Sequence, residues 1–408
     1  MRRVVVTGMG AVTPIGNSVP EYWNSLVNGV NGIAPITHFD TSDSKCKLAA
    51  EVKSFDPSAV LDKGTVRKTD LYTQYALVSA EEAMQDSAIA GTVDETELGV
   101  YFGSGVGGID TTLENHAGLL SGGPRKVSPQ FVPKMIINIA AGQIAIRFNA
   151  HGNAMSMSTA CATGTTAIGE AYRAIKDGYL TAAICGGSEA SINSLCVAGF
   201  VNCMALSQAT DPNEASLPFD SRRAGFVIGE GAGALILEEY EHAVARGAKI
   251  YAEICGYGAT CDAHHVTAPD PEATYTAKAI EKALAGVDYS ADSLYINAHG
   301  TGTSLNDTTE TKAFKLAFGE KAKDVKISST KSMTGHMLGA AGAAEAIACV
   351  KALETGILPP TINLISPDPV CDLDYVPCKA QKVQVDTAIS TSLGFGGHNA
   401  CIAFRLVK

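Results

Sequence analysis

The chain has 408 residues, of which 46% are hydrophobic and 18% are charged. This balance excludes a disordered chain and indicates either one large core or two to three domains. The formal net charge of −11 disfavours nonspecific binding to nucleic acid. No stretch of about 18 apolar residues lacks polar interruption, so we expect no membrane span. The eleven cysteines show no regular spacing, which favours a reducing, cytoplasmic setting. We therefore expect a globular enzyme.

Short β-branched segments alternate with alanine-rich segments that show helical spacing. The predicted strands cover residues 3–7, 98–102, 181–185, 234–237, 250–254, 294–297, 325–328 and 400–404. The predicted helices cover residues 76–87, 165–177, 277–285 and 340–354. Alternation of this kind is typical of α/β layers around largely parallel sheets.

A weak internal repeat divides the chain. Residues 158–164 and 329–335 share the pattern S-T-x-x-x-T-G, and each copy precedes an alanine-rich helix. Residues 100–103 and 294–297 form a second weak pair in the same order. The sequence therefore predicts two similar halves, residues 1–250 and 251–408, with equivalent strand ends facing each other. Active sites of open α/β sheets lie at the carboxyl ends of strands.

Cys161 is the residue that most suggests chemistry. It lies where a strand-like run, residues 154–158, gives way to a helix. A thiol at a helix N-terminus experiences the positive end of the helix dipole, which lowers its pKa. This arrangement is a nucleophile elbow with sulfur in place of oxygen. A buried structural cysteine is the alternative, and the position alone does not separate the two.

Two histidines and a lysine follow in the second half. His299 comes after the strand 294–297, and His336 stands in the second repeat copy. Either position also suits a hydrogen-bonded structural histidine. Lys331 lies one residue before the counterpart of Cys161, among small and apolar neighbours. A buried lysine needs a carboxylate partner, for which Glu345 on the following helix is the candidate. A solvated lysine and a surface glutamate are the alternatives.

Metal and phosphate sites are not indicated. The chain has no C-x-x-C, and the pairs Cys261/His264 and His398/Cys401 each lack a second cluster, so we expect no metal. The glycines at 103–108 lack the Lys-Ser/Thr of a P-loop. By contrast, the glycine-dense loop 393–399 allows close backbone approach to a ligand and movement of Phe395. A plain turn with a packed phenylalanine is the alternative.

Seven of these segments occur in order along the whole chain: residues 3–8, 158–164, 218–220, 229–233, 297–303, 329–342 and 393–399. Together they resemble the β-ketoacyl-acyl-carrier-protein synthases, the elongating condensing enzymes of the thiolase fold. The resemblance implies two duplicated halves packed as α-β-α-β-α layers, and a homodimer that works with acyl-carrier protein. It also implies decarboxylative condensation of an acyl-enzyme thioester with malonyl-carrier protein, giving a 3-oxoacyl product.

The resemblance assigns roles to the candidate residues. Cys161 is the acylated nucleophile, and His299 and His336 are hydrogen-bond donors to the enolate. Lys331 and Glu345 hold His336 and bias its tautomer. The backbone N–H groups of Cys161 and Phe395 form a second oxyanion hole.

The remaining assignments concern substrate and cofactor. Thr301 and Thr303 contact the pantetheine arm, and Phe395 is a gate. Val106 borders the acyl tunnel, and Phe200 belongs to the substrate site. No cofactor is required; a monovalent cation is compatible with the family and would lie near Asn297, Glu345 and Ser392.

The resemblance also bears on protein partners. Both the carrier protein and this chain are acidic, so a local basic patch on this chain would be needed to bind the carrier. Scattered basic residues that only aid solubility are the alternative. The candidates are Lys63, Arg67, Lys68, Arg125 and Lys126. For the homodimer interface, the apolar stretch 140–145 and the strand after Met155 are candidates.

Departures from the family pattern keep some alternatives open. Gly302 lies between the two threonines where many members have serine, and no proline follows Thr303. His398 stands where some members have threonine. These departures blur substrate preference, so a polyketide or secondary lipid pathway remains an alternative to fatty acid elongation. A degradative thiolase is disfavoured because loop 393–399 lacks a second active cysteine. A non-catalytic chain-length factor is disfavoured because Cys161 is present.

Overall fold

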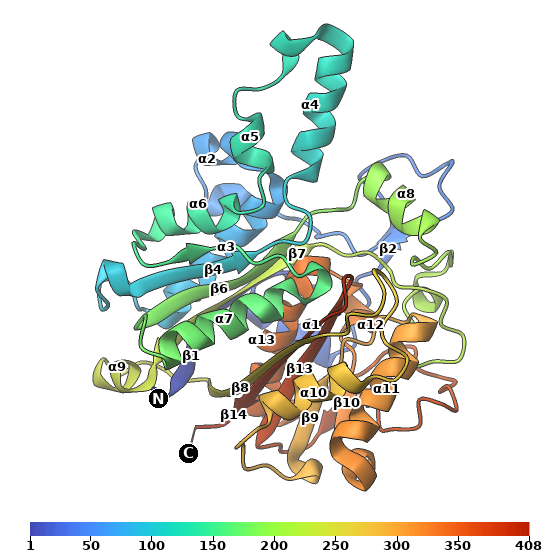
Figure 1. The fold of residues 1–408 in the computed structure, drawn as a ribbon. Coiled ribbons are helices and arrows are strands. Elements are labelled where there is room, and N and C mark those ends of the chain that lie inside the picture. The colour runs from blue at the N-terminus through green and yellow to red at the C-terminus, as the bar shows by residue number, and fades with distance from the viewer. Residues whose placement is uncertain (408) are drawn as a thin grey trace.

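The computed structural model describes residues 1–407, and its centre is one sheet of ten strands (Figure 1). Strand β1 pairs antiparallel with β8, through Val4↔Ile254 to Val6↔Ala252, and this pairing joins the two halves. The strand order is β10 (Lys326–Ser328), β9 (Leu294–Asn297), β13 (Thr387–Gly394), β14 (His398–Arg405), β8 (Ala252–Cys261), β1 (Val4–Val12), β7 (Gly231–Glu239), β6 (Ala182–Glu189), β4 (Leu98–Gly103) and β5 (Ala154–Met155).

The strand order is the same in both halves. In each half we number the five strands by their order along the chain. Outward from the junction, the order in the sheet is then first, fifth, fourth, second and third, as β1-β7-β6-β4-β5 and β8-β14-β13-β9-β10. The strands of the first set end at Glu239, and those of the second begin at Ala252. A boundary near residue 250 stays a prediction that this order supports.

Helices form three layers around the two halves of the sheet (Figure 1). Helices α7 (Thr163–Lys176) and α13 (Ala341–Thr355) lie in the middle and are buried on most sides. Helix α13 has almost no polar face, and such a helix is stable only when it is surrounded by protein, whereas α7 keeps Glu170 and Arg173 accessible. On the outside, α3 (Leu71–Ser87) and α6 (Ile139–Phe148) cover one half, and α10 (Thr274–Ala283) with α11 (Ser304–Phe318) covers the other. The layers therefore run α-β-α-β-α.

The shorter elements lie around these layers. Helix α4, the turn 124–126 and α5 form an arm that projects from the body (Figure 1). None of the helices within residues 1–407 is both long and apolar enough to cross a membrane. The remaining elements are α1 (Val19–Val27), α2 (Lys63–Lys68), α4 (Ile109–Gly122), α5 (Phe131–Met135), α8 (Ser194–Asn202), α9 (Tyr240–Ala245), α12 (Lys331–Thr334), β2 (Ala34–Pro35), β3 (Leu48–Ala49), β11 (Ile357–Leu358) and β12 (Gln381–Lys382).

The predicted elements are found, but their pairing differs from the prediction. Strand 294–297 has the predicted bounds, and helix 340–354 is displaced by one residue. The largely parallel arrangement is wrong, because β1, β7, β8 and β14 pair antiparallel with their neighbours. A short turn joins β13 to β14, and such a connection permits only antiparallel pairing. Strand β13 was missed because its alternating Ser and Thr residues mask a segment that is buried from Thr387 to Leu393.

The two central helices approach each other most closely at their N-terminal ends. A Cβ on Gly164 would lie 2.7 Å from the backbone N of Ala343 and 3.1 Å from the carbonyl O of Gly339. A Cβ on Gly342 would lie 2.7 Å from the backbone N of Thr165. These glycines are therefore required for the contact, which brings the end of the first motif copy against the residues that follow the second copy.

Candidate active site

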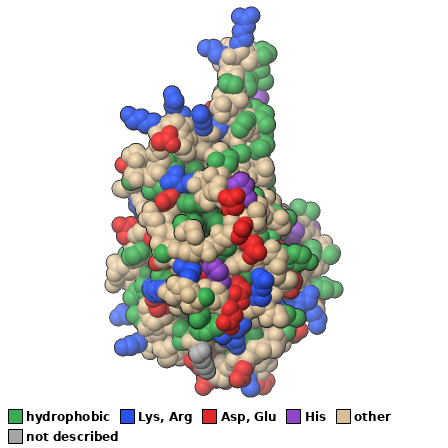
Figure 2. Space-filling view, turned by 90° about the vertical axis from the view of Figure 1, so that its left-hand side faces the viewer, with side chains coloured by type: hydrophobic (Ala, Val, Ile, Leu, Met, Phe, Trp, Pro, Cys, Tyr) green, Lys and Arg blue, Asp and Glu red, His purple; other side chains and the backbone are tan. Residues whose placement is uncertain are grey.

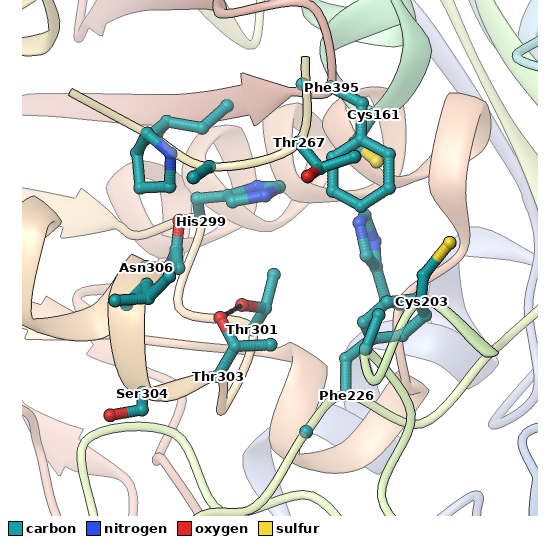
Figure 3. Close-up of a pocket in the computed structure, with 18 of the residues that line it drawn as sticks. Cys161, Cys203, Phe226, Thr267, His299, Thr301, Thr303, Ser304, Asn306 and Phe395 are labelled. Atoms are coloured by element: carbon teal, nitrogen blue, oxygen red, sulfur yellow. Dashed lines mark hydrogen bonds between the residues drawn. The ribbon is translucent and has the colours of Figure 1, made fainter. Parts of the chain in front are cut away.

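Cys161 lies on a tight turn, residues 160–162, that leads directly into α7. Ala160 has φ +49°, in the left-handed region that costs a non-glycine residue free energy. The end of β13 packs against this turn: a Cβ on Gly394 would lie 2.5 Å from Thr159 O and 3.2 Å from Cys161 N. The preceding strand ends at Met155, earlier than predicted. The turn presents the thiol to a cavity (Figure 3).

The cavity has a volume of about 390 Å³ and is lined by Cys161, His299 and His336. His299 follows β9, and His336 follows α12, so the second half supplies both rings. The ring centroids lie 5.2 Å apart, with the planes at 86°. Phe226 packs edge-on against the His336 ring at 5.2 Å. The structure therefore brings one thiol and two imidazoles from opposite halves to a single space.

Both imidazoles are held in the neutral form. Burial lowers the pKa of His299 and His336 well below the ordinary 6.5, and the Lys331 ammonium lowers both further. Within residues 1–407, neither Nδ1 atom has a hydrogen-bond partner. A neutral imidazole can donate from one ring nitrogen and accept at the other. The pair can therefore stabilise developing negative charge or move a proton.

Lys331 and Glu345 form a buried ion pair, and their side chains are 1% and 3% exposed. Burial raises the pKa of Glu345, and the Lys331 ammonium opposes this. In the described part of the chain Lys331 donates to Glu345 and makes no hydrogen bond to His336. The pair therefore makes no direct hydrogen bond to His336, and its bias on the His336 tautomer stays a prediction that the Lys331 charge would exert through space. The His336 backbone is held instead by its N–H bond to Val227 O, at 2.7 Å.

The expected lowering of the Cys161 pKa is wrong. Burial raises the pKa of this thiol to about 12, and the nearby Glu189 carboxylate contributes to the increase. Lys331 and the backbone N–H groups of Phe395 and Cys161 act in the opposite direction. Loss of hydration outweighs the helix N-terminus here. The resting side chain is therefore a thiol, and a base must accept its proton.

The other predicted contacts divide into two groups. Thr301 and Thr303 line the cavity with their hydroxyl oxygens 3.0 Å apart (Figure 3), and Phe200 and Phe395 also line it. Val106 does not line this cavity, and 39% of the residue is exposed. Its backbone N–H bonds to a Glu189 oxygen at 3.2 Å. The place of Val106 at an acyl tunnel therefore stays a prediction.

Buried carboxylates around the site were missed by sequence reasoning. Glu310 accepts hydrogen bonds from the backbone N of His299 (2.7 Å), the backbone N of Gly300 (2.8 Å) and the hydroxyl of Thr391 (2.7 Å). Burial raises its pKa to about 7. Asp262, on the cavity wall, accepts from Asn399 Nδ2 at 2.6 Å. An acidic residue on a helix normally faces water, so only the fold reveals that Glu310 points inward.

Comparison with known proteins agrees with this architecture. The beta-ketoacyl synthase N-terminal domain matches residues 1–243, and the C-terminal domain matches residues 251–365. The chain is 49% identical to the 3-oxoacyl-[acyl-carrier-protein] synthase 2 of Synechocystis sp., covering 99% of this chain and 98% of that protein. It is 48% identical to the Staphylococcus aureus protein of the same name, with equal coverage.

Solved structures show the same fold. A beta-ketoacyl synthase from Burkholderia phymatum STM815 is 36% identical over the full length of both chains, with a TM-score of 0.92. A ketosynthase of a type II PKS, solved with its acyl-carrier protein and bound to the hexaketide, is 35% identical over both full chains, with a TM-score of 0.90. The layers of this chain are therefore those of the thiolase-like fold. The chain belongs to the beta-ketoacyl synthase family of condensing enzymes.

Proposed function

We propose that this protein condenses an acyl group carried on Cys161 with malonyl-acyl-carrier protein, releasing carbon dioxide and forming a 3-oxoacyl-carrier thioester. The observation that carries the proposal is the single cavity that joins Cys161 to two neutral imidazoles. The full-length relatives named 3-oxoacyl-[acyl-carrier-protein] synthase 2 support the same reaction.

In the first half-reaction the Cys161 sulfur attacks the carbonyl carbon of an acyl-carrier thioester. One neutral imidazole accepts the thiol proton and returns it to the departing pantetheine sulfur. The oxyanion forms beside the backbone N–H groups of Cys161 and Phe395, which face the sulfur closely enough to lower its pKa. Thr301 and Thr303 offer hydroxyl groups to the pantetheine arm along the cavity.

In the second half-reaction the malonyl thioester loses carbon dioxide, and the electrons of the broken C–C bond pass to the thioester oxygen. His299 and His336 donate hydrogen bonds to this enolate oxygen. The enolate carbon then attacks the acyl carbonyl, and the Cys161 sulfur departs and regains a proton. Neutral rings suit this role because a donor is needed and a full positive charge is not.

Fatty acid elongation is the pathway we favour. The curated relatives carry the name of that enzyme at 48–49% identity. The polyketide ketosynthase with a similar structure is only 35% identical. The departures around Thr303 and His398 then concern chain preference within elongation.

A basic surface is proposed as the docking site for the carrier protein. Lys and Arg side chains gather at the tip of the projecting arm and on the body beneath it (Figure 2). The proposed residues are exposed: Lys63, Arg67, Lys68, Arg125 and Lys126. Basic groups on an otherwise acidic protein would steer an acidic partner. We further propose that the protein is a cytoplasmic homodimer. Within each chain we place the boundary between the two halves near residue 250.

A monovalent cation fits the centre of the molecule. Asn297 Oδ1 and Glu345 Oε2 are buried acceptors without a hydrogen-bond partner within residues 1–407. Unpaired buried oxygens are costly, and a cation would satisfy them. Among the described residues no group of three or more His, Cys, Asp or Glu side chains could hold a metal ion. No catalytic step requires the cation.

The test is acyl transfer followed by condensation. Wild-type protein incubated with acyl-carrier proteins of several chain lengths should gain the acyl mass on Cys161, and addition of malonyl-carrier protein should release the 3-oxoacyl product. Cys161→Ala, the matched control, should not be acylated. Absence of acylation in the wild type, with all carriers, would reject the proposal.

A further inference from the structure

Glu189, the last residue of β6, is fully buried and does not line the cavity. Its Oε1 accepts from the Ser104 hydroxyl (2.8 Å), the Val106 backbone N (3.2 Å) and the Ser191 hydroxyl (3.3 Å). Its Oε2 accepts from the backbone N atoms of Gly105 (2.8 Å) and Gly339 (3.0 Å). Within residues 1–407 no cation pairs with it, so neutral donors alone stabilise this carboxylate.

These donors come from segments that surround the two reacting groups. Gly339 follows His336 by three residues, and the 104–106 turn follows β4. A Cβ on Gly105 would lie 2.7 Å from Glu189 Oε2 and 3.7 Å from the carbonyl of Ala160, the residue before Cys161. The carboxylate therefore links the turn that follows His336 to the 104–106 turn, and Gly105 of that turn lies beside the residue before Cys161.

We propose that Glu189 is a positioning residue for condensation: its carboxylate fixes the turn after His336 to the 104–106 turn, which lies beside the turn of Cys161. This inference rests on the proposed function, in which thiol and imidazole act on one substrate. Burial raises the pKa of Glu189, and the hydrogen bonds from Ser104 and the backbone N–H groups of Gly105, Val106 and Gly339 oppose this and so favour the ionised carboxylate. In a glutamine, either orientation of the amide directs an NH₂ group at two or more N–H or O–H groups.

The charge of Glu189 allows this positioning role to be distinguished from a purely structural one, because the charge also affects the pKa of Cys161. The carboxylate raises the pKa of the Cys161 thiol. Removal of the Glu189 charge therefore favours the Cys161 thiolate. Removal of the Glu189 hydrogen bonds moves the Cys161 sulfur away from its position against His336. Alkylation by a small reagent needs only the thiolate, so its pH dependence should shift to lower pH. Condensation, which needs the thiol placed against His336, should become slower. A purely structural role predicts no such opposition.

The experiment compares three variants by condensation rate and by the pH dependence of iodoacetamide alkylation, measured at Cys161 by peptide mass spectrometry. Glu189→Gln should lower condensation about 100-fold, as expected for a misplacement of roughly 1 Å, and should shift the Cys161 alkylation curve to lower pH. Ser104→Ala keeps the charge and removes one donor, so condensation should fall less and the alkylation curve should stay in place. Glu238→Gln is the matched control, because Glu238 is also buried and accepts from three side chains: Thr7, His242 and Arg246. It should change neither property.

Wild-type condensation or an unshifted alkylation curve in Glu189→Gln overturns the inference. If that variant does not fold, Ser104→Ala decides, and wild-type condensation in it overturns the inference as well. Failure of the wild-type protein to accept any acyl group rejects the proposed function instead. The alkylation curves then still decide whether the Glu189 charge acts on Cys161.

Discussion

Lys331→Met tests the electrostatic balance beneath the active site. The substitution preserves much of the side-chain volume and removes the one cation that pairs with Glu345 in the described chain. Both partners are almost fully buried, so Glu345 is left as an unpaired charge. Removing one member of a buried pair costs about 3–5 kcal/mol of folding free energy.

The loss should grow with pH, and the sign follows from the carboxyl group. Burial already holds the folded-state pKa of Glu345 above its ordinary 4.5 in the wild type, and loss of the Lys331 ammonium, which opposes this, raises that pKa further. As pH rises past 4.5 the unfolded chain ionises first, so the folded state loses stability. Each pH unit adds about 1.4 kcal/mol until the folded-state pKa is passed. Lys331→Met should therefore be less stable, relative to the wild type, at pH 8 than at pH 6.

Urea unfolding at both pH values, in one fixed salt, measures these differences. The double variant Lys331→Met/Glu345→Leu should recover most of the loss, because replacing both members of a buried pair by apolar residues is often neutral. Equal destabilisation of Lys331→Met at pH 6 and pH 8, or a double variant as unstable as the single one, would refute the reasoning.

Four further outcomes are expected. His299→Ala should lower carbon dioxide release from malonyl-carrier protein about 100- to 1,000-fold; a loss below tenfold contradicts its donor role. Wild-type decarboxylation should stay flat from pH 8 to about 6, because the imidazole pKa values lie well below 6.5; a midpoint near 6.5 contradicts neutrality. Gly394→Ala places a Cβ 2.5 Å from Thr159 O, so acylation of Cys161 should slow and the melting temperature should fall; wild-type rates refute this. Val106→Phe should shorten the accepted acyl chain, because Val106 is predicted to border the acyl tunnel; an unchanged product profile contradicts this.

Local patterns in the sequence predicted much of the fold. Buried runs such as residues 294–297 and the alanine-rich segment 340–354 carry their periodicity in a few adjacent residues, so their bounds were found to within one residue. The pairing of strands was not predictable in this way. Whether β14 runs antiparallel to β8 depends on partners more than 100 residues apart in the chain. No local periodicity encodes such a register.

The sequence by itself determined the α/β class, the turn that carries Cys161, and the repeated motif that places His336 at an equivalent turn. These features depend on neighbouring residues, whose backbone preferences and spacing can be read directly. The tertiary structure alone decided the protonation states. Burial raised the pKa of Cys161 and lowered those of His299 and His336, and distant segments brought Glu310 and Glu189 inward. Loss of water around a charge is a property of the assembled molecule, since chain segments far apart in sequence exclude that water together.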